Sequence, residues 1–340
     1  MASEGVENKI KTILVTGGGG FLGKAIVGQL MESGKKVISF SRHESLALRK
    51  MGVDQIQGDL SNREAVLRAV EGMDAVFHVA AKAGVWGGYN SYYDINVRGT
   101  EHVIEACRTH GNLPLVHTSS PSVVFHSSDM EGENESLPFA PSYLTHYPET
   151  KALAEQRVMA ASRQGLSCII LRPHLIWGPG DNHLIPRIIE RGHRLKRIGR
   201  KDDLVDTIYV DNAAHAHLLA LDRLLRDPGL SGRAYFISQD APISKWALMD
   251  AFLAAAGKPP VKGHISARTA YGIGWLLETL YGILGISSEP PMTRFVAKEL
   301  ATSHWFDISR AKTELGYRPR VSTEEGLKRV KDWLDTRPFD

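Results

Sequence analysis

Two side chains near the middle of the chain could together move a proton. Tyr147 and Lys151 belong to the segment Tyr-Pro-Glu-Thr-Lys. On a helix their spacing places both on one face, one turn apart, and Pro148 suits a first helical turn. A phenol has a pKa of about 10, and a neighbouring cation that stabilises the phenolate makes tyrosine a usable acid or base near neutral pH. This pair therefore predicts a group that protonates the oxygen of a carbonyl during its reduction.

A serine at the end of a predicted strand could complete the catalytic set. Ser120 follows the apolar segment 114–118. Its hydroxyl could hydrogen-bond the same substrate oxygen and hold the carbonyl in line for attack. Ser119 and Ser122 flank the same strand end, so the sequence leaves open which of the three serines acts.

A glycine-rich turn lies near the N-terminus, directly after the apolar segment 12–16. Gly17 permits a tight turn, Gly20 lets the backbone approach a pyrophosphate, and Gly23 allows the following helix to pack closely on the strand. The start of that helix would offer free N–H groups and the positive end of its dipole to phosphates. We predict a dinucleotide site, and the residues expected to contact the cofactor here are Gly17, Gly20, Phe21, Leu22 and Gly23.

The residues after the second predicted strand indicate which dinucleotide binds. An acidic residue there would accept a hydrogen bond from the ribose 2′-hydroxyl and repel a 2′-phosphate. This chain has Ser41 and Arg42 instead, and its first carboxylate is Glu44. A hydroxyl beside a guanidinium predicts NADP(H), unless Arg42 is only a solvated surface charge. Further along, Asp59 could accept a hydrogen bond from the adenine amino group, or it could cap a helix. Asp59 and the following Leu60 are also predicted to contact the cofactor.

Alternating strand and helix patterns must position these residues. Short β-branched segments separated by helical ones predict right-handed βαβ units and a doubly wound parallel sheet of the Rossmann type, in the α/β class. The predicted strands are 12–16, 36–40, 55–57, 75–79, 114–118 and 167–171, with helices at 21–33, 96–110 and 149–163. We expect the chain to return to the sheet at 206–210 and 234–238. Ligands of such sheets bind at the carboxyl ends of the strands.

The later part of the chain is predicted to form a smaller, mostly helical cap. We expect a dinucleotide-binding domain at 1–178 plus 203–238 and a substrate-binding cap at 179–202 plus 239–340. The longest apolar segment, 271–286, has 16 residues and contains Glu278. A membrane-spanning helix needs about 20 apolar residues. We therefore expect this segment to be buried in the cap or to dock on another protein, with interfacial membrane contact as the alternative.

Composition and charge exclude some partners. The 340 residues carry 41 basic and 38 acidic side chains, so the net charge is +3, which does not favour nucleic-acid binding. Cys107 and Cys168 lack metal-type neighbours. We expect two buried thiols, no metal site and a cytoplasmic protein, whose polar first residues lead into the first strand without a secretory signal.

Several segments together resemble the extended short-chain dehydrogenase/reductases, in the branch of 3β-hydroxysteroid and sterol-4-carboxylate 3-dehydrogenases. They are TGGGGFLG at 16–23, GDL at 58–60, FHVAA at 77–81, NVRGT at 96–100, TSSPSVVF at 118–125, YPETK at 147–151, LRPHLIWGPGD at 171–181 and VDTIYVDN at 205–212, and the match continues through 310–327. Within the branch, the segments at 80–100, 175–187 and 291–306 are similar to the bacterial 2-alkyl-3-oxoalkanoate reductases of long-chain olefin biosynthesis.

The resemblance implies a role for each matching residue. Tyr147 would be the general acid, Lys151 would lower its pKa and hold the nicotinamide ribose, and Ser120 would polarise the carbonyl. Ser41 stands where many NAD-using relatives have Asp, which favours NADPH and reduction. Further cofactor residues implied are Ala80 and Ala81 beside the ribose and nicotinamide, Asn96 as an orienter of the lysine, and Pro173 and His174 beside the carboxamide.

The implied substrate is a hydrophobic small-molecule acid, a 2-alkyl-3-oxoalkanoate with two long alkyl chains. It needs a large apolar cavity and a cation or N–H donors for its carboxylate. The apolar candidates are Val85, Trp86, Tyr143, Trp177 and the 271–286 helix, and the cationic candidates are Lys82, His146, Arg187 and Arg294. Each aromatic could equally belong to the core, and each cation to a solvated face.

Three other functions fit parts of the sequence. The first is NAD(P)-dependent oxidation of a 3β-hydroxysteroid or sterol 4-carboxylate, which is the same chemistry reversed. The second is a sugar-nucleotide epimerase or dehydratase, and the third is a non-catalytic dinucleotide-binding protein. The resemblance also allows a homodimer and contact with other enzymes of the pathway through the 271–286 helix.

Overall fold

The computed structural model describes residues 10–199 and 203–336, so the ends of the predicted domains at 1–9, 200–202 and 337–340 lie outside the described residues. Within these ranges a seven-stranded sheet has the order β12-β7-β5-β4-β1-β2-β3, with every neighbouring pair parallel. Its strands are β1 (Thr12–Thr16), β2 (Lys36–Ser41), β3 (Asp54–Gln57), β4 (Ala75–His78), β5 (Leu115–Thr118), β7 (Cys168–Pro173) and β12 (Ala234–Ile237). The strand order reverses at β1, as in a Rossmann fold, and the predicted doubly wound sheet is confirmed.

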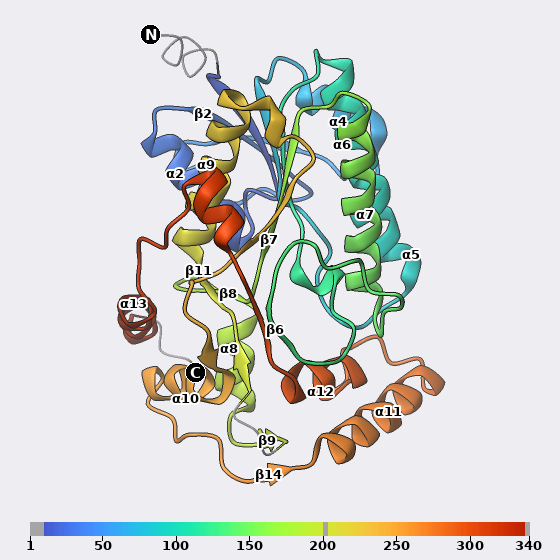
Figure 1. Cartoon of the computed structure of the whole chain (residues 1–340), viewed down its shortest axis with the longest axis vertical. Coiled ribbons are helices and arrows are strands. Elements are labelled where there is room, and N and C mark those ends of the chain that lie inside the picture. The colour runs from blue at the N-terminus through green and yellow to red at the C-terminus, as the bar shows by residue number, and fades with distance from the viewer. Residues whose placement is uncertain (1–9, 200–202, 337–340) are drawn as a thin grey trace.

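Helices cover both faces of this sheet (Figure 1). On one face lie α2 (Phe21–Glu32) and α9 (Val210–Arg226), and on the other lie α4 (Arg63–Val70), α6 (Gly99–Thr109) and α7 (His146–Arg163). Because both faces are covered, every residue of β4, β5, β7 and β12 is buried. The helix predicted at 96–110 begins earlier, with α5 (Tyr89–Tyr92) and a π-helical segment at Tyr93–Arg98.

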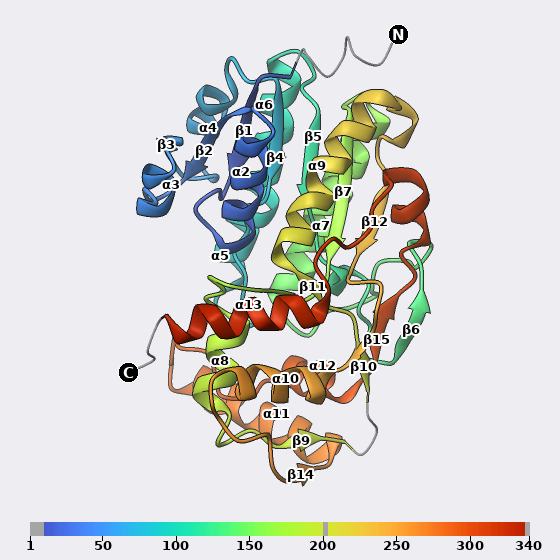
Figure 2. The same cartoon turned by 90° about the vertical axis from the view of Figure 1, so that its left-hand side faces the viewer.

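The cap lies beyond the carboxyl ends of the strands (Figure 2). It contains α8 (Leu184–Arg191), α10 (Lys245–Ala255), α11 (Ala267–Ile283) and α12 (Arg294–Ala301), and α13 (Thr323–Asp335) lies between the cap and the sheet. Among the described residues a small sheet has the order β13-β10-β15-β6. Its strands are β13 (Ile243–Ser244), β10 (Leu204–Val205), β15 (His304–Phe306) and β6 (Met130–Glu133).

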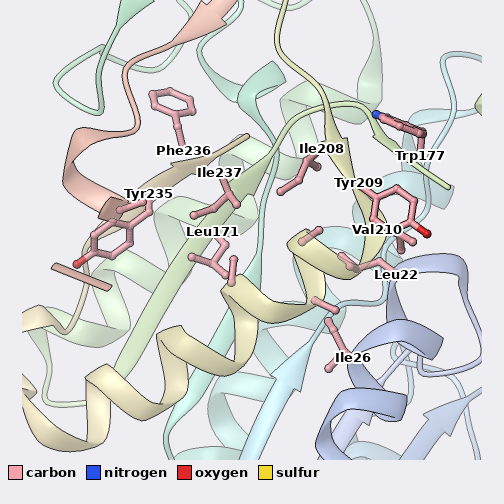
Figure 3. Close-up of a cluster of buried hydrophobic side chains, with 14 of the residues drawn as sticks. Leu22, Ile26, Leu171, Trp177, Ile208, Tyr209, Val210, Tyr235, Phe236 and Ile237 are labelled. Carbon is pink, nitrogen blue, oxygen red and sulfur yellow. The ribbon is translucent and has the colours of Figure 1, made fainter. Parts of the chain in front are cut away.

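One predicted return to the main sheet is confirmed and the other is wrong. The segment at 234–238 forms the edge strand β12, as predicted. The segment at 206–210 instead contributes β11 (Ile208–Tyr209), which pairs with β8 (Ile176–Trp177) in a separate two-stranded sheet. The pairing holds the chain beside the junction of cap and sheet, where Trp177, Tyr209 and Phe236 belong to one buried apolar cluster (Figure 3).

The apolar segment at 271–286 lies mostly on the surface. It forms most of α11, in which only Ala270 and Gly274 are buried. Trp275 is 55% exposed and Ile283 is 76% exposed, so of the two expectations burial in the cap is excluded, and docking on another protein stays a prediction. No helix in the described ranges combines the length and apolar character that crossing a membrane requires.

Candidate active site

One large pocket lies between the sheet and the cap. Its volume is about 1090 Å³, and it is lined by the segments that follow β1, β2, β3, β4, β5 and β7, by the start of α7 and by α12. This is the position that a doubly wound sheet gives its ligands. The predicted cofactor and catalytic residues can therefore be placed against a single cavity.

The glycine turn forms one end of this pocket. Gly17 has a φ of +70°, and the N–H of Gly20 donates to its carbonyl oxygen over 2.9 Å. A Cβ on Gly23 would lie 2.1 Å from that same oxygen, and a Cβ on Gly17 would lie 2.9 Å from Cα of Ala80. Side chains at these positions would strike the backbone, so only glycines allow this tight turn, and its backbone can approach a pyrophosphate closely. Phe21 and Leu22 open α2 and also line the pocket.

The residues expected to select the dinucleotide line the same end. Ser41, Arg42, Asp59 and Leu60 all border the pocket. Asp59 does not cap α4, since the capping side chain is that of Asn62. Although burial raises the pKa of Asp59, hydrogen bonds from Ser61 and the charge of Arg42 outweigh it and hold that pKa below its usual value. Arg42 thus lies near enough to Asp59 to act on its charge.

Tyr147 and Lys151 occupy the first two turns of α7 and both line the pocket. The Lys151 ammonium donates to the carbonyl oxygen of Thr118 over 2.6 Å. Burial lowers the pKa of Lys151 to about 8, against the opposing charge of Glu155. Burial also raises the pKa of Tyr147, and the hydrogen bond with Ser120 only partly offsets this. The phenol of Tyr147 is therefore neutral at physiological pH and has a proton to donate, and the lowering of its pKa by Lys151 stays a prediction.

The structure separates the three serines. Ser119 lines the pocket but is buried, and it donates its hydroxyl to Glu155 Oε2 over 2.5 Å. Ser120 hydrogen-bonds Tyr147, and its Oγ accepts from the hydroxyl of Ser122 over 2.9 Å. Ser120 is therefore the serine whose hydroxyl adjoins the phenol, with Ser122 as its support.

Most of the remaining predicted cofactor residues line the pocket, and one does not. Ala80, Ala81, Pro173 and His174 border it. Asn96 is buried outside the pocket, where its amide nitrogen donates to the Lys82 carbonyl and to Thr150 Oγ1 and its amide oxygen accepts from the Lys82 N–H. Asn96 is therefore not a pocket-lining residue, and its role as an orienter of Lys151 stays a prediction. Its side chain links the segment around Lys82, which lines the pocket, to Thr150 of α7.

Only some of the predicted substrate residues line the pocket. Lys82 and Val85 line the pocket, with the Lys82 ammonium 2.6 Å from Ser91 Oγ. The prediction is wrong for Trp177, which is fully buried with its ring edge-on to Tyr209 and Phe252.

The prediction of substrate contacts is also wrong for Tyr143 and Trp86, because both side chains pack outside the pocket. Tyr143 donates its hydroxyl to the Val123 carbonyl over 2.9 Å. Trp86 donates its indole N–H to the Ile286 carbonyl over 3.0 Å, and its ring meets Tyr281 edge-on.

Two of the proposed cations are already paired with carboxylates. Arg187 makes two hydrogen bonds to Glu289, and Arg294 lies 2.5 Å from Glu278. His146 lies outside the pocket, edge-on to the ring of Tyr89. These partners leave Lys82 as the pocket-lining member of the predicted cationic set.

Sequence reasoning missed the contribution of α12. Phe295 and Glu299 line the pocket, as do Asp181 and His183 before α8. Their segments carry no spacing motif, and only the resemblance at 291–306 and 175–187 pointed to them.

Comparison with known proteins shows the family of this chain. The sequence model of the 3-beta hydroxysteroid dehydrogenase/isomerase family matches residues 14–263. A 2-alkyl-3-oxoalkanoate reductase of Shewanella oneidensis is 48% identical over 340 residues, covering 97% of this chain and 88% of the relative. A protein of the same name from Stenotrophomonas maltophilia is 49% identical, covering 94% and 98%.

Solved structures share the architecture. The crystal structure of gox2253 has a TM-score of 0.79 at 26% identity, covering 96% of this chain and 99% of the other. A dTDP-glucose 4,6-dehydratase of Bacillus anthracis in complex with NAD has a TM-score of 0.73 at 20% identity, covering 96% and 97%, and shares the fold alone. With the family match and the two relatives, these findings show that the chain belongs to the 3-beta hydroxysteroid dehydrogenase/isomerase family of extended short-chain dehydrogenase/reductases.

Proposed function

We propose that this protein uses NADPH to reduce the 3-keto group of a long-chain 2-alkyl-3-oxoalkanoate to the 2-alkyl-3-hydroxyalkanoate, in long-chain olefin biosynthesis. The observation that carries the proposal is one continuous pocket. It joins the glycine turn to Ser120, Tyr147 and Lys151 and continues to Val85 and Phe295. The printed names of the two bacterial relatives support the substrate class.

Each residue of the set has a distinct task in this reaction. When bound, the dinucleotide supplies the hydride that reaches C3 of the substrate. Tyr147 donates its proton to the oxygen as that oxygen becomes an alkoxide, and Ser120 donates a hydrogen bond to the same oxygen. The Lys151 ammonium, with a pKa of about 8, is charged at neutral pH and stabilises the phenolate that remains.

The preference for NADPH rests on Ser41 and Arg42. Both line the pocket end that holds the glycine turn. A guanidinium there can make a bidentate contact with a 2′-phosphate, and the carboxylate that would repel this phosphate is absent from position 41.

A second candidate is oxidation of a 3β-hydroxysteroid or a sterol carboxylate, which the family description favours. The same catalytic set serves both directions, so the substrate decides between them. A panel of 2-alkyl-3-oxo acids and hydroxysteroids, assayed with NADP(H) and NAD(H), tests the proposal. We expect kcat/KM for the long-chain oxo acid with NADPH to exceed kcat/KM for every hydroxysteroid by at least about 100-fold. Faster turnover of a hydroxysteroid would refute it.

A further inference from the structure

The loop that follows β4 brings a lysine to the pocket. Lys82 comes directly after Ala80 and Ala81, between β4 and α5, and all three residues border the same cavity. The Lys82 ammonium donates to Ser91 Oγ over 2.6 Å and lies 4.7 Å from the ring centre of Tyr92. The mechanism of the reduction assigns no task to this ammonium.

The neighbours of the ammonium hold it in place and leave it able to bind an anion. The Ser91 hydroxyl donates its own proton to the Gly88 carbonyl oxygen over 2.6 Å, so it meets Lys82 as an acceptor. An ammonium has three N–H donors, and Ser91 takes one of them. Within the described ranges no carboxylate forms an ion pair with Lys82. Two donors therefore remain for the two oxygens of a carboxylate ligand.

Main-chain hydrogen bonds hold the start of this loop against the catalytic helix α7. The N–H of Lys82 donates to Asn96 Oδ1 over 2.7 Å, and Asn96 Nδ2 donates back to the Lys82 carbonyl oxygen over 3.1 Å. The same amide nitrogen donates to Thr150 Oγ1 over 3.0 Å. Thr150 directly precedes Lys151. The main chain of Lys82 is therefore tied, through one side chain, to the residue next to the catalytic lysine.

Ring contacts hold the side chain of Lys82 near the first turn of the same helix. Tyr92, whose ring lies under the ammonium, is buried, and its ring centre lies 6.3 Å from that of His146. The ring of Tyr89 meets His146 edge-on at 5.3 Å. His146 directly precedes Tyr147. These contacts place the ammonium at the catalytic end of the pocket.

We propose that the Lys82 ammonium binds the carboxylate of the substrate and so selects 2-alkyl-3-oxo acids over their esters. This inference rests on the proposed function, because it requires a substrate that carries a carboxylate. In such an acid the carboxylate carbon lies two bonds from C3, whose oxygen meets Tyr147. The group that binds the carboxylate must therefore lie near the first turn of α7, where the contacts of Asn96 and Tyr92 hold Lys82. The resulting hydrogen bonds are charge-assisted on both sides.

The other cationic side chains of the pocket have different positions or partners. Lys151 donates to the Thr118 carbonyl oxygen over 2.6 Å and serves the phenol of Tyr147. Arg42 borders the end of the pocket that holds the glycine turn, where the dinucleotide is expected. Lys82 is thus the cation that the structure leaves for the acid group of the substrate.

The acidic side chains of the pocket favour the same location. Of the four that line the described pocket, three accept hydrogen bonds from other parts of the chain, namely Asp59, Asp94 and Asp181. The fourth, Glu299, lies on α12 of the cap. A negative charge there would repel a substrate carboxylate, which favours seating that group on the side of the sheet, beside Lys82.

Oxidation of a 2-alkyl-3-hydroxy acid and of its methyl ester by NADP+ tests the inference. This direction passes through the same transition state and avoids the spontaneous loss of CO2 from 3-oxo acids. In Lys82→Met we expect kcat/KM for the acid to fall about 10- to 100-fold, mainly through KM, and kcat/KM for the ester to change less than about threefold. Lys82→Arg keeps the charge, so the acid-to-ester ratio should stay within about fivefold of the wild type.

The matched control removes a positive charge outside the pocket. Arg187→Met deletes a cation that is paired with Glu289, and it should leave the acid-to-ester ratio unchanged.

The outcomes separate the inference from the proposed function. Equal losses for acid and ester in Lys82→Met would mean that Lys82 only supports its loop, and would overturn the inference while the proposed function stands. A wild type that oxidises both compounds equally well, or a ratio in Lys82→Arg as low as in Lys82→Met, would overturn it in the same way. If the wild type binds NADP+ but oxidises neither compound, the proposed function fails and the inference fails with it.

Discussion

Arg172 of β7 and Glu155 of α7 form a buried ion pair, with Arg172 Nη2 2.6 Å from Glu155 Oε1. Their side chains are 4% and 0% exposed. Because Glu155 lies on α7 one turn after Lys151, the pair fixes the catalytic helix to β7. The hydroxyl of Ser119 also donates to Glu155, so the end of β5 joins the same network.

Breaking this ion pair should lower the stability of the folded protein. Glu155→Gln leaves the Arg172 guanidinium buried without its carboxylate, so we expect the free energy of unfolding to fall by about 3–5 kcal/mol in urea denaturation. The joint replacement Glu155→Leu with Arg172→Met removes both charges and should recover most of that loss. A Glu155→Gln variant as stable as the wild type would show that the pair does not hold α7.

The two neighbouring serines should respond differently to alanine. Ser120→Ala removes the hydroxyl beside Tyr147, and we expect kcat to fall by about 10²–10³-fold. Ser119→Ala, the matched control, should change kcat by less than about tenfold and should mainly lower stability, because Ser119 bonds Glu155. Steady-state kinetics and urea denaturation of both variants check this. Loss of turnover in Ser119→Ala alone would reverse the assignment.

Arg42 should control the choice of dinucleotide. Arg42→Gln removes a charged hydrogen-bond donor from the pocket end that carries the glycine turn, so we expect kcat/KM for NADPH to fall about 10- to 100-fold. The value for NADH should change little, because NADH lacks the 2′-phosphate. Ser41→Asp should reverse the preference. Equal losses with both dinucleotides would mean that Arg42 supports the fold and does not recognise the phosphate.

Lys151 should make the stability of the cofactor-free protein depend on pH. Burial lowers its pKa in the folded state to about 8, from 10.5 in the unfolded chain. Between these values the unfolded state binds more protons, so the contribution of Lys151 to stability rises with pH and is lost as the pH falls through 8. Lys151→Met should therefore be more stable than the wild type at pH 7, and the difference should shrink between about pH 8 and 10.5. Urea denaturation at several pH values measures the difference in unfolding free energy between the variant and the wild type. A difference that does not change with pH would contradict a buried ammonium with a lowered pKa.

Local patterns in the sequence predicted the cofactor and catalytic ends of the pocket. The spacing within the glycine turn reflects a local contact, since a Cβ on Gly23 would strike the carbonyl of Gly17 six positions earlier. Tyr147 and Lys151 likewise lie one turn apart on a single helix. Spacing along the chain was therefore sufficient to predict that the glycine turn and the pair Tyr147 and Lys151 line the pocket.

The substrate end depends on contacts between distant segments, and there the prediction was partly wrong. Trp177 is excluded from the pocket because α13 packs against it, so closely that a Cβ on Gly326 would lie 2.7 Å from its ring. Glu299 and Phe295 of α12 line the same pocket as Tyr147, which lies about 150 positions earlier in the chain. Periodicity within either segment carries no information about such packing.

The most direct test of the account is the turnover of Tyr147→Phe with NADPH and a long-chain 2-alkyl-3-oxo acid. The substitution removes the proton donor and leaves the ring and the glycine turn in place. We expect kcat to fall by about 10²–10⁴-fold while the Kd for NADPH, measured by fluorescence titration, stays within a factor of about three. Turnover within tenfold of the wild type, with NADPH bound equally well, would contradict the assignment of Tyr147 as the acid of a carbonyl reductase.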